Sequence, residues 1–322
     1  MRKILIVGGD GFLGSNLLWY AKEKHEVVAT TRSFPFNVEG CKVELLDIAE
    51  KDRCVQIMRK HDPDLVINTV AVVGLDVAEK DRDLTRQVHV QGTKNLVDAC
   101  KQPGAEIVYI STDYVFDGTK IGGTYDESDQ PSPINYYGAT KLEAEGIVRD
   151  SGLDWIIGRP AHLYGPNFAT PFVEDVLRQT HAQKRCSYPE TLLNMLRGGQ
   201  AIALPTELYQ TPVLASDFSQ ALLSLIDLGA RGIYNICGPD CVSRYRFYSE
   251  LARTFGADSG LVTATSVEEY ARLLNVPANI LPRRVCMNAS KVEGIVGRKM
   301  LGIRDGLALF RSQLDAGERR VG

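Results

Sequence analysis

Residues 3–14 read KILIVGGDGFLG, a short apolar run that passes directly into a glycine-rich turn. Gly8, Gly11 and Gly14 form the pattern G-x-x-G-x-x-G. A turn without Cβ atoms lets backbone N–H groups and the N-terminus of the next helix approach a pyrophosphate closely. An ordinary tight turn is the alternative, but a position between a first strand and a first helix predicts a dinucleotide site, which includes Phe12 and Leu13.

The first half of the chain alternates short apolar runs with longer amphipathic stretches. We expect strands at 4–7, 26–31, 43–46, 65–69, 106–111 and 155–158, and helices near 12–24, 51–61, 84–101 and 136–150. Buried strands that alternate with helices indicate a parallel sheet covered on both faces. The predicted fold is therefore α/β, a Rossmann-type doubly wound sheet, whose ligands bind beyond the carboxyl ends of the strands.

The alternation of short apolar runs and amphipathic stretches changes after Pro160, and residues 164–211 are rich in proline, glycine and aromatic residues. Helices are expected near 172–183, 216–228 and 244–255, with a strand at 232–236. We predict a dinucleotide-binding domain at 1–165, to which 212–237 returns. Residues 166–211 and 238–322 then form a smaller, interleaved C-terminal substrate domain.

The composition excludes several classes of protein. With a net charge of −3 over 322 residues, no basic face for nucleic acid is indicated. No apolar stretch is long enough to span a bilayer, which predicts a soluble, cytoplasmic protein. The seven cysteines are scattered and match no zinc-site spacing, so we expect no metal and reduced thiols that mostly fill the core.

The end of the second strand addresses the choice of cofactor. Enzymes that use NAD commonly place an acid here, whereas an arginine accommodates the 2′-phosphate of NADP. The chain reads Thr30-Thr31-Arg32, which favours NADP(H) over NAD(H), unless Arg32 is only a solvated loop residue. Asp47 is placed to accept a hydrogen bond from the adenine amino group. Further cofactor contacts are expected at the following strand ends and on the fourth helix, from Ile48, Val70, Ala71, Val72 and His89.

A tyrosine and a lysine four residues apart predict the catalytic pair. Tyr137 and Lys141 share one face of a helix, downstream of the strand that ends near Ser111 and Thr112. Their joint chemistry is carbonyl reduction, in which the tyrosine gives a proton to the oxygen and Thr112 hydrogen-bonds the same oxygen. We expect the Lys141 ammonium to lower the pKa of Tyr137 towards neutral pH and to hold the cofactor ribose. Tyr136 is the rival tyrosine, but its spacing turns it off this face.

These motifs resemble the extended short-chain dehydrogenase/reductase family, and within it the dTDP-4-dehydrorhamnose reductase group. The resemblance runs through nearly the whole chain and is most specific at residues 111–118, STDYVFDG, and at residues 136–141, YYGATK. It implies the catalytic trio Thr112, Tyr137 and Lys141, with Asp113 and Val115 on the substrate. It also implies a homodimer formed through the helices at 84–101 and 136–150.

Three positions depart from the pattern of that group. His89 replaces the usual asparagine, residues 69–72 read TVAV instead of carrying a pair of alanines, and residues 282–287 read PRRVCM. The last departure leaves the identity of the substrate open, with Arg283 or Arg284 expected along the nucleotide. For His89 we expect a neutral ring that points inward and supports the site; simple core packing is the alternative.

The resemblance implies NADP(H)-dependent reduction of a nucleotide-diphospho-4-keto-6-deoxysugar. A nucleotide-sugar epimerase on the same fold is one alternative. Another is a non-catalytic NADP-binding regulatory subunit, because the regulatory subunit of methionine adenosyltransferase resembles the same group. A dehydratase is disfavoured, since Thr112 is followed by Asp113 and Tyr114 and not by the Asp-Glu pair that elimination uses.

Overall fold

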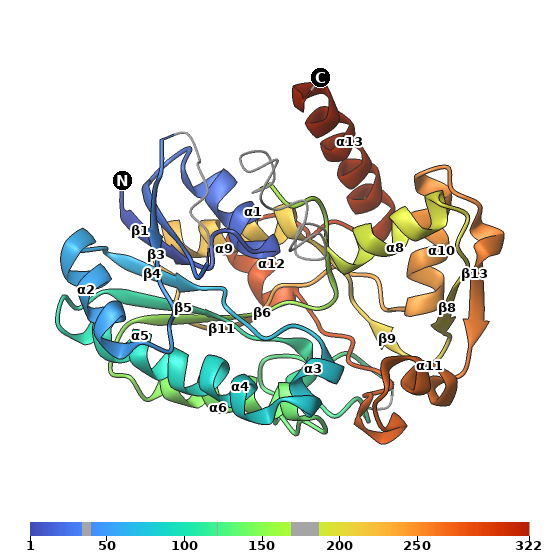
Figure 1. The fold of residues 1–322 in the computed structure, drawn as a ribbon, viewed down its shortest axis with the longest axis horizontal. Coiled ribbons are helices and arrows are strands. Elements are labelled where there is room, and N and C mark those ends of the chain that lie inside the picture. The colour runs from blue at the N-terminus through green and yellow to red at the C-terminus, as the bar shows by residue number, and fades with distance from the viewer. Residues whose placement is uncertain (34–39, 121, 169–186, 322) are drawn as a thin grey trace.

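A computed structural model describes residues 1–33, 40–120, 122–168 and 187–321 (Figure 1). Its centre is a seven-stranded sheet of order β11-β6-β5-β4-β1-β2-β3, in which every neighbouring pair is parallel. The strands are β1 (Lys3–Val7), β2 (Glu26–Thr31), β3 (Lys42–Leu45), β4 (Leu65–Asn68), β5 (Glu106–Ile110), β6 (Trp155–Arg159) and β11 (Gly232–Asn235). The predicted doubly wound fold is confirmed, and each predicted strand agrees to within one residue at either end.

Helices cover both faces of this sheet because side chains alternate along each strand. In β1, Ile4 and Ile6 belong to a core shared with α1 (Phe12–Ala21) and α9 (Ala215–Asp227). Leu5 and Val7 face the opposite way, into a core shared with α2 (Lys51–His61), α5 (Thr93–Lys101) and α6 (Tyr136–Arg149). The two helical layers lie above and below the sheet in Figure 1.

The predicted helix at 84–101 is divided. It consists of α4 (Arg82–Arg86), a π-helical turn η1 (Gln87–Gly92) and then α5. A π-helical turn inside a helix is rare and is often found at functional sites. His89 lies within this turn, and it is buried there together with Val88 and Gly92.

A second hydrophobic core lies beside the carboxyl edge of the sheet, at the right of Figure 1. It is built mainly from segments after residue 160, with Leu75 as a member from the first half of the chain. Its elements are α8 (Tyr188–Arg197), α10 (Arg244–Thr254), α11 (Val267–Leu274), α13 (Ile303–Val321) and the pair β8 (Ile202–Pro205) and β13 (Val262–Thr265). The smaller elements are α3 (Leu75–Lys80), α12 (Ser290–Val296), β7 (Leu163–Tyr164), β9 (Tyr209–Gln210), β10 (Val213–Leu214) and β12 (Val242–Ser243). The strand β11 returns to the main sheet, and Val292 of α12 also packs in the core of that sheet.

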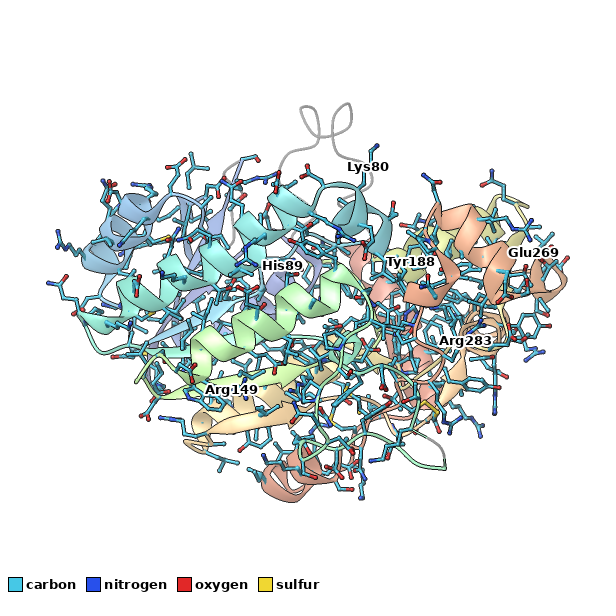
Figure 2. All side chains as sticks on the ribbon, turned by 90° about the horizontal axis from the view of Figure 1, so that it is seen from below. Lys80, His89, Arg149, Tyr188, Glu269 and Arg283 are labelled. Atoms are coloured by element: carbon cyan, nitrogen blue, oxygen red, sulfur yellow. A yellow bond between two sulfur atoms is a disulfide. The ribbon has the colours of Figure 1, made fainter. Side chains whose placement is uncertain are left out.

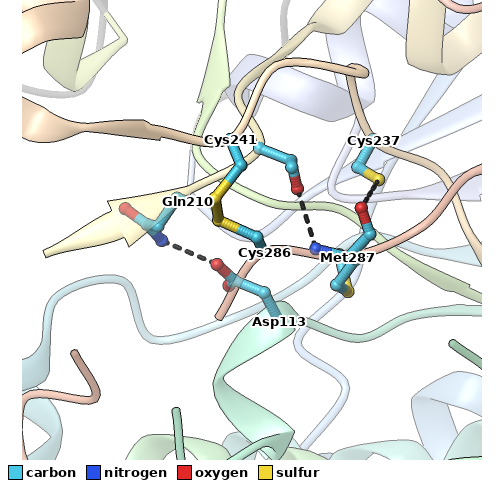
Figure 3. The surroundings of a disulfide bond; sticks show 7 residues. Asp113, Gln210, Cys237, Cys241, Cys286 and Met287 are labelled. Atoms are coloured by element: carbon cyan, nitrogen blue, oxygen red, sulfur yellow. Dashed lines mark hydrogen bonds between the residues drawn. A yellow bond between two sulfur atoms is a disulfide. The ribbon is translucent and has the colours of Figure 1, made fainter. Parts of the chain in front are cut away.

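The prediction that the cysteines are reduced, scattered thiols is wrong for one pair. Cys241 and Cys286 form a disulfide, with their Cα atoms 5.5 Å apart (Figure 3). They are 45 residues apart in the sequence, but both adjoin segments that bond to Tyr209: Ser243 of β12 pairs with it, and Val285 donates its N–H to the Tyr209 carbonyl. Spacing along the chain cannot reveal such a pairing. Among the described cysteines, Cys54, Cys100 and Cys237 are free and buried, as expected of core residues.

The helix expected near 172–183 and Cys186 lie outside the described residues. Among the helices that are described, none combines the length and the apolar character that a membrane span requires.

Candidate active site

The expected site residues follow neighbouring strands of the parallel sheet. The glycine turn follows β1, Arg32 follows β2, Asp47 follows β3, residues 70–72 follow β4 and Thr112 follows β5. These strands are adjacent in the order β5-β4-β1-β2-β3, so their carboxyl ends meet along one edge. The structure therefore gathers the predicted cofactor and catalytic residues at the place where α/β sheets bind ligands.

The glycine turn is too tight for side chains. Gly8 has a φ of +84°, and a Cβ atom on Gly14 would lie 2.0 Å from the Gly8 carbonyl oxygen. The N-terminus of α1 has no acidic residue in its first turn, and its first N–H groups have no carbonyl behind them in the helix. This cradle suits a phosphate, and the turn at Phe12 and Leu13 delivers those N–H groups to it.

Two threonines hold the turn in place, a role that the sequence alone did not suggest. The Gly8 N–H donates to Thr30 Oγ1 at 3.3 Å, and the Gly9 N–H donates to the Thr30 carbonyl at 2.8 Å. The Thr69 hydroxyl donates to the Val7 carbonyl at 2.8 Å. Because these bonds use β2 and β4, the strands on either side of β1 fix the turn.

The ends of β2 and β3 present an arginine and an acid. Arg32 is exposed directly after β2, and among the described residues no ion pair neutralises it. Asp47 accepts a hydrogen bond from the Ala49 N–H at 2.9 Å, which leaves its other carboxylate oxygen for a further partner. Ile48 is buried against Gly92, where a Cβ would come within 2.5 Å of its Cδ1 atom. Ile48 thus packs beneath the carboxyl ends of these strands, against the helical layer.

His89 connects the turn after β4 to the catalytic helix. Its Nε2 accepts the Val72 N–H at 2.9 Å, and its Nδ1 lies 2.9 Å from the Thr140 hydroxyl (Figure 2 shows His89 on the helical layer). Burial, with a smaller effect of the Lys141 charge, lowers the pKa of His89 to about 3. The expectation that the ring points inward is confirmed, and the low pKa supports a neutral ring at pH 7.

Helix α6 carries the tyrosine and the lysine. Asn135 caps it by accepting the Gly138 N–H at 2.7 Å, and a Cβ on Gly138 would lie 2.1 Å from the Tyr114 carbonyl. The cap and the glycine thus dock α6 against the turn η2 (Asp113–Val115), which follows Thr112. Tyr137 faces this turn, with its ring edge-on to that of Tyr114 at a centroid distance of 6.2 Å.

Tyr136 points elsewhere. Its N–H donates to Glu79 at 2.8 Å, and the Arg82 guanidinium lies 4.9 Å from the centre of its ring. These contacts place Tyr136 against α3 and α4, away from Thr112. The rotation that the spacing predicts between the two tyrosines is therefore present.

The expected effect of Lys141 on Tyr137 is wrong. Burial, with added repulsion from Asp113 and Tyr114, raises the pKa of Tyr137, while the nearby Thr112 hydroxyl opposes the rise. The Lys141 ammonium donates to the Ile110 carbonyl and lies 4.2 Å from the centre of the Tyr109 ring. Burial lowers the pKa of Lys141 to about 7. Tyr137 is consequently a protonated phenol at neutral pH.

Asp113 is buried next to Thr112, and it hydrogen-bonds to Gln210, a residue that the sequence alone did not suggest for the site. It accepts the Thr112 hydroxyl at 3.0 Å and the Gln210 amide at 2.6 Å (Figure 3). Burial raises its pKa to about 6. Gln210 Oε1 is buried, and none of the described residues hydrogen-bonds to it. Val115, expected on the substrate, is fully buried in the core behind this turn.

The two arginines expected along the nucleotide differ in their surroundings. Arg283, which is labelled in Figure 2, is exposed and pairs with Glu268 at 2.8 Å and with Glu207 at 3.5 Å. The Arg284 guanidinium lies 5.4 Å from the centre of the Tyr209 ring. The charge of Arg283 is thus already compensated by carboxylates, whereas Arg284 is held by an aromatic face.

A buried ion pair stands behind the catalytic helix and was also missed. Arg159 of β6 donates two hydrogen bonds to Glu145 of α6, at 2.9 and 2.7 Å, and the Ser111 hydroxyl donates to the same carboxylate. Both charged residues are fully buried, so removing either alone would leave an unpaired charge in the core. No cluster of His, Cys, Asp or Glu suited to a metal ion occurs in the described parts of the chain.

One family model and several known proteins match this chain in sequence or in structure. The model of the RmlD substrate binding domain family matches residues 1–314. A probable low-salt glycan biosynthesis reductase from Haloferax volcanii is 30% identical and covers 95% of this chain and 96% of its own. The dTDP-4-dehydrorhamnose reductase of Bacillus anthracis, solved in complex with NADP, superposes with a TM-score of 0.79 at 25% identity, over 97% of this chain and 99% of its own.

A relative with a different role also matches. The beta subunit of mouse methionine adenosyltransferase 2 is 33% identical, but over only 52% of this chain and 48% of its own length. The family model, in contrast, covers both the sheet and the second core. From that match and the archaeal relative it follows that the chain belongs to the RmlD substrate binding domain family, as its motifs predict.

Proposed function

We propose that this oxidoreductase of the RmlD family uses NADP(H) to reduce the 4-keto group of a nucleotide-diphospho-6-deoxysugar. The observation that carries the proposal is the position of Tyr137 beside Thr112, at the same sheet edge as the glycine cradle. A bound nicotinamide, a buried phenol and a hydroxyl are the groups that carbonyl reduction needs. Its relatives named as reductases support the same chemistry.

Each catalytic residue has a distinct task in this proposal. When bound, NADPH supplies a hydride to the carbonyl carbon. Tyr137 gives its proton to the carbonyl oxygen, which its raised pKa permits because the phenol is protonated at neutral pH. Thr112, whose hydroxyl donates to Asp113 in this structure, would rotate that hydroxyl to donate to the same oxygen and so stabilise the charge that develops there. Lys141, anchored on the Ile110 carbonyl, holds the cofactor ribose.

The preference for NADP(H) rests on Arg32. Its exposed guanidinium follows the strand end where the ribose of a dinucleotide lies in this fold. No acid occupies that strand end, since β2 finishes at Thr30 and Thr31. Asp47, Ile48 and residues 70–72 would contact the adenine and the remaining cofactor surface, and His89 would hold the last of these segments in place.

The sugar would lie between η2 and the second core, with Asp113 on one of its hydroxyl groups. The nucleotide would extend along the second core, where we place it against Arg284 with Arg283 nearby. We further propose a cytoplasmic homodimer that buries α6 together with the helical layer at 82–101. These assignments derive from the family resemblance, and the buried position of Val115 limits it to shaping the pocket.

One alternative has an observation of its own in favour. The mouse regulatory subunit matches half of this chain, so binding of NADP(H) without turnover is the second candidate function. The presence of Thr112, Tyr137 and Lys141 at one site favours the enzyme. An epimerase on this fold would return its cofactor unchanged, and the same assay separates it from a reductase.

A thermal-shift panel tests the proposal. Only ligands that bind the native state raise the unfolding midpoint. At a ligand concentration of 100 times Kd, the free energy of unfolding increases by about 2.7 kcal/mol. With NADPH present, a nucleotide-diphospho-4-keto-6-deoxysugar should raise the midpoint further, and the free sugar should not. A panel in which no nucleotide sugar adds to the NADPH shift would contradict the proposed substrate class.

A further inference from the structure

Arg244, the first residue of α10, is held by two tyrosines, and the buried carboxyl of Asp113, on which its charge acts, lies beyond ion-pair distance. Its Nη1 atom donates to the Tyr270 hydroxyl at 2.8 Å and its Nη2 atom to the Tyr114 hydroxyl at 2.9 Å. Its Nε atom is shielded from solvent and has no acceptor in the described part of the chain. Over the described ranges, no carboxylate lies within 4.0 Å of this guanidinium, although ion pairs of that kind hold Arg283 and Arg298.

The side chains that hydrogen-bond to Arg244 are uncharged, and others in the same cluster are incompletely bonded. Tyr248 is fully buried, yet its hydroxyl has no partner among the described residues, and Nε2 of His162 also lacks one. Burial, and then the Arg244 charge, lower the pKa of His162 well below its usual range, so this ring is uncharged. The Tyr188 and Tyr270 hydroxyls lie 3.4 Å apart at the edge of the same cluster (Tyr188 is labelled in Figure 2).

A guanidinium among phenols is an unfavourable arrangement for a structural residue. Arg244 is partly buried, and taking a charge even partly out of water costs free energy unless an opposite charge and hydrogen bonds replace the solvent. The phenols supply hydrogen bonds, and the Asp113 carboxyl lies beyond ion-pair distance. Within the described residues, three shielded polar atoms have no partner: Arg244 Nε, Tyr248 Oη and His162 Nε2. An anionic ligand that accepts hydrogen bonds would satisfy both needs.

The cluster is connected to the catalytic residues through one side chain. Tyr114 receives the Arg244 hydrogen bond at its hydroxyl, and its ring packs edge-on against Tyr137. Its backbone lies two residues after Thr112, in η2. The Tyr114 side chain thus bridges Arg244 and Tyr137. In a nucleotide sugar, the diphosphate is attached to C1, across the sugar ring from a carbonyl at C4, so a cation on the far side of Tyr114 from Tyr137 suits the diphosphate.

We propose that Arg244 binds the diphosphate of the nucleotide sugar, with the surrounding tyrosine hydroxyls and His162 as additional hydrogen-bonding groups. This inference rests on the proposed function, since it takes Tyr137 as the position of the carbonyl. It assigns the main anion contact to Arg244 and leaves Arg284 to the nucleoside. Arginine suits this task because its planar fork can donate two parallel hydrogen bonds to phosphate oxygens.

Calorimetric titration of dTDP, and of UDP as a second probe, into the NADPH-loaded protein tests the assignment. We expect Arg244→Gln to weaken binding of the nucleoside diphosphate ten- to a hundredfold, the range for losing a charge-assisted contact. The Kd for NADPH and the unfolding midpoint should stay unchanged. Arg246→Gln is the matched control: it removes an exposed arginine from the same helix and should leave all three quantities unchanged.

Two results would overturn the inference. One is unaltered affinity for the nucleoside diphosphate in Arg244→Gln; the other is an equal loss for NADPH, which would mark Arg244 as structural. Arg244→Met replaces the glutamine variant if that variant does not fold, and the same criteria apply. The titration needs no turnover, so a protein that binds dTDP through Arg244 but does not oxidise NADPH would retain this inference and lose the proposed reductase activity.

Discussion

The Nε2 atom of His89 accepts a hydrogen bond from the backbone N–H of Val72, at 2.9 Å. This contact fixes the tautomer, because a nitrogen that accepts a hydrogen bond carries no proton. The proton is then on Nδ1 and is donated to the Thr140 hydroxyl, which in turn donates to the Tyr136 carbonyl at 3.0 Å. The ring thus ties the turn after β4 to the first turn of the catalytic helix.

Replacing His89 tests this connection. His89→Asn retains a donor and an acceptor, so we expect substantial activity. His89→Leu leaves the Val72 N–H unpaired and should lose much of the activity while the protein stays folded, as circular dichroism would verify. Full activity in the leucine variant would leave His89 as core packing.

The proton donor is tested by two tyrosine variants. Tyr137→Phe should preserve the fold and NADPH binding but lower kcat by about two to four orders of magnitude, the usual loss when a general acid is removed. Tyr136→Phe, whose ring packs under Arg82, should have a much smaller effect. Steady-state kinetics of both variants provide the comparison, and a reversed order would show that the other tyrosine is the donor.

The choice between the two nicotinamide cofactors depends on Arg32. A charge-assisted contact to the 2′-phosphate contributes roughly 1.5–3 kcal/mol, so Arg32→Ala should weaken NADPH about ten- to a hundredfold. NADH, which lacks this phosphate, should bind almost as before. Fluorescence titration of both cofactors measures the two constants. Equal losses would mean that Arg32 does not contact the phosphate.

The raised pKa of Asp113 predicts a pH-dependent difference in stability. Because the folded state holds the proton more tightly than the unfolded chain, this carboxyl favours folding below its unfolded pKa near 4, and the benefit is lost as the pH rises through about 6. Asp113→Asn does not titrate, and Gln210 can turn its unpartnered oxygen towards the new amide. The stability of the variant relative to the parent should therefore increase from pH 4 to pH 6 and then level off. A constant difference across that range, measured by urea unfolding, would show that Asp113 keeps its ordinary pKa.

The sequence predicted most of the sheet because its signals are local. Short apolar runs mark buried strands, and the glycines at 8, 11 and 14 have a steric reason that the fold makes explicit. The spacing of Tyr136 and Tyr137 from Lys141 was enough to separate the two phenols. The π-helical turn at His89 was not foreseen, since the amphipathic pattern of residues 84–101 predicts one continuous helix.

The remaining features depend on contacts between distant segments. Cys241 meets Cys286 only because two segments bond to the same strand, and Gln210 reaches Asp113 across 97 residues of sequence. The pKa of Tyr137 is raised by burial and by Asp113 and Tyr114, which helical spacing cannot specify. Arg244 carries no motif of its own. Its hydrogen bonds to Tyr114 and Tyr270 join segments 130 and 26 residues away in the sequence.

NADPH oxidation by the purified chain alone tests the central claim most directly. With NADPH and a nucleotide-diphospho-4-keto-6-deoxysugar present, the wild-type protein should consume NADPH and form an equimolar amount of the 4-hydroxy sugar. The Tyr137→Phe variant should be nearly inactive under the same conditions. Conversion of the sugar with no net loss of NADPH would identify an epimerase. Binding of NADPH with no change in any sugar, in the absence of a partner protein, would contradict the reductase and favour a regulatory subunit.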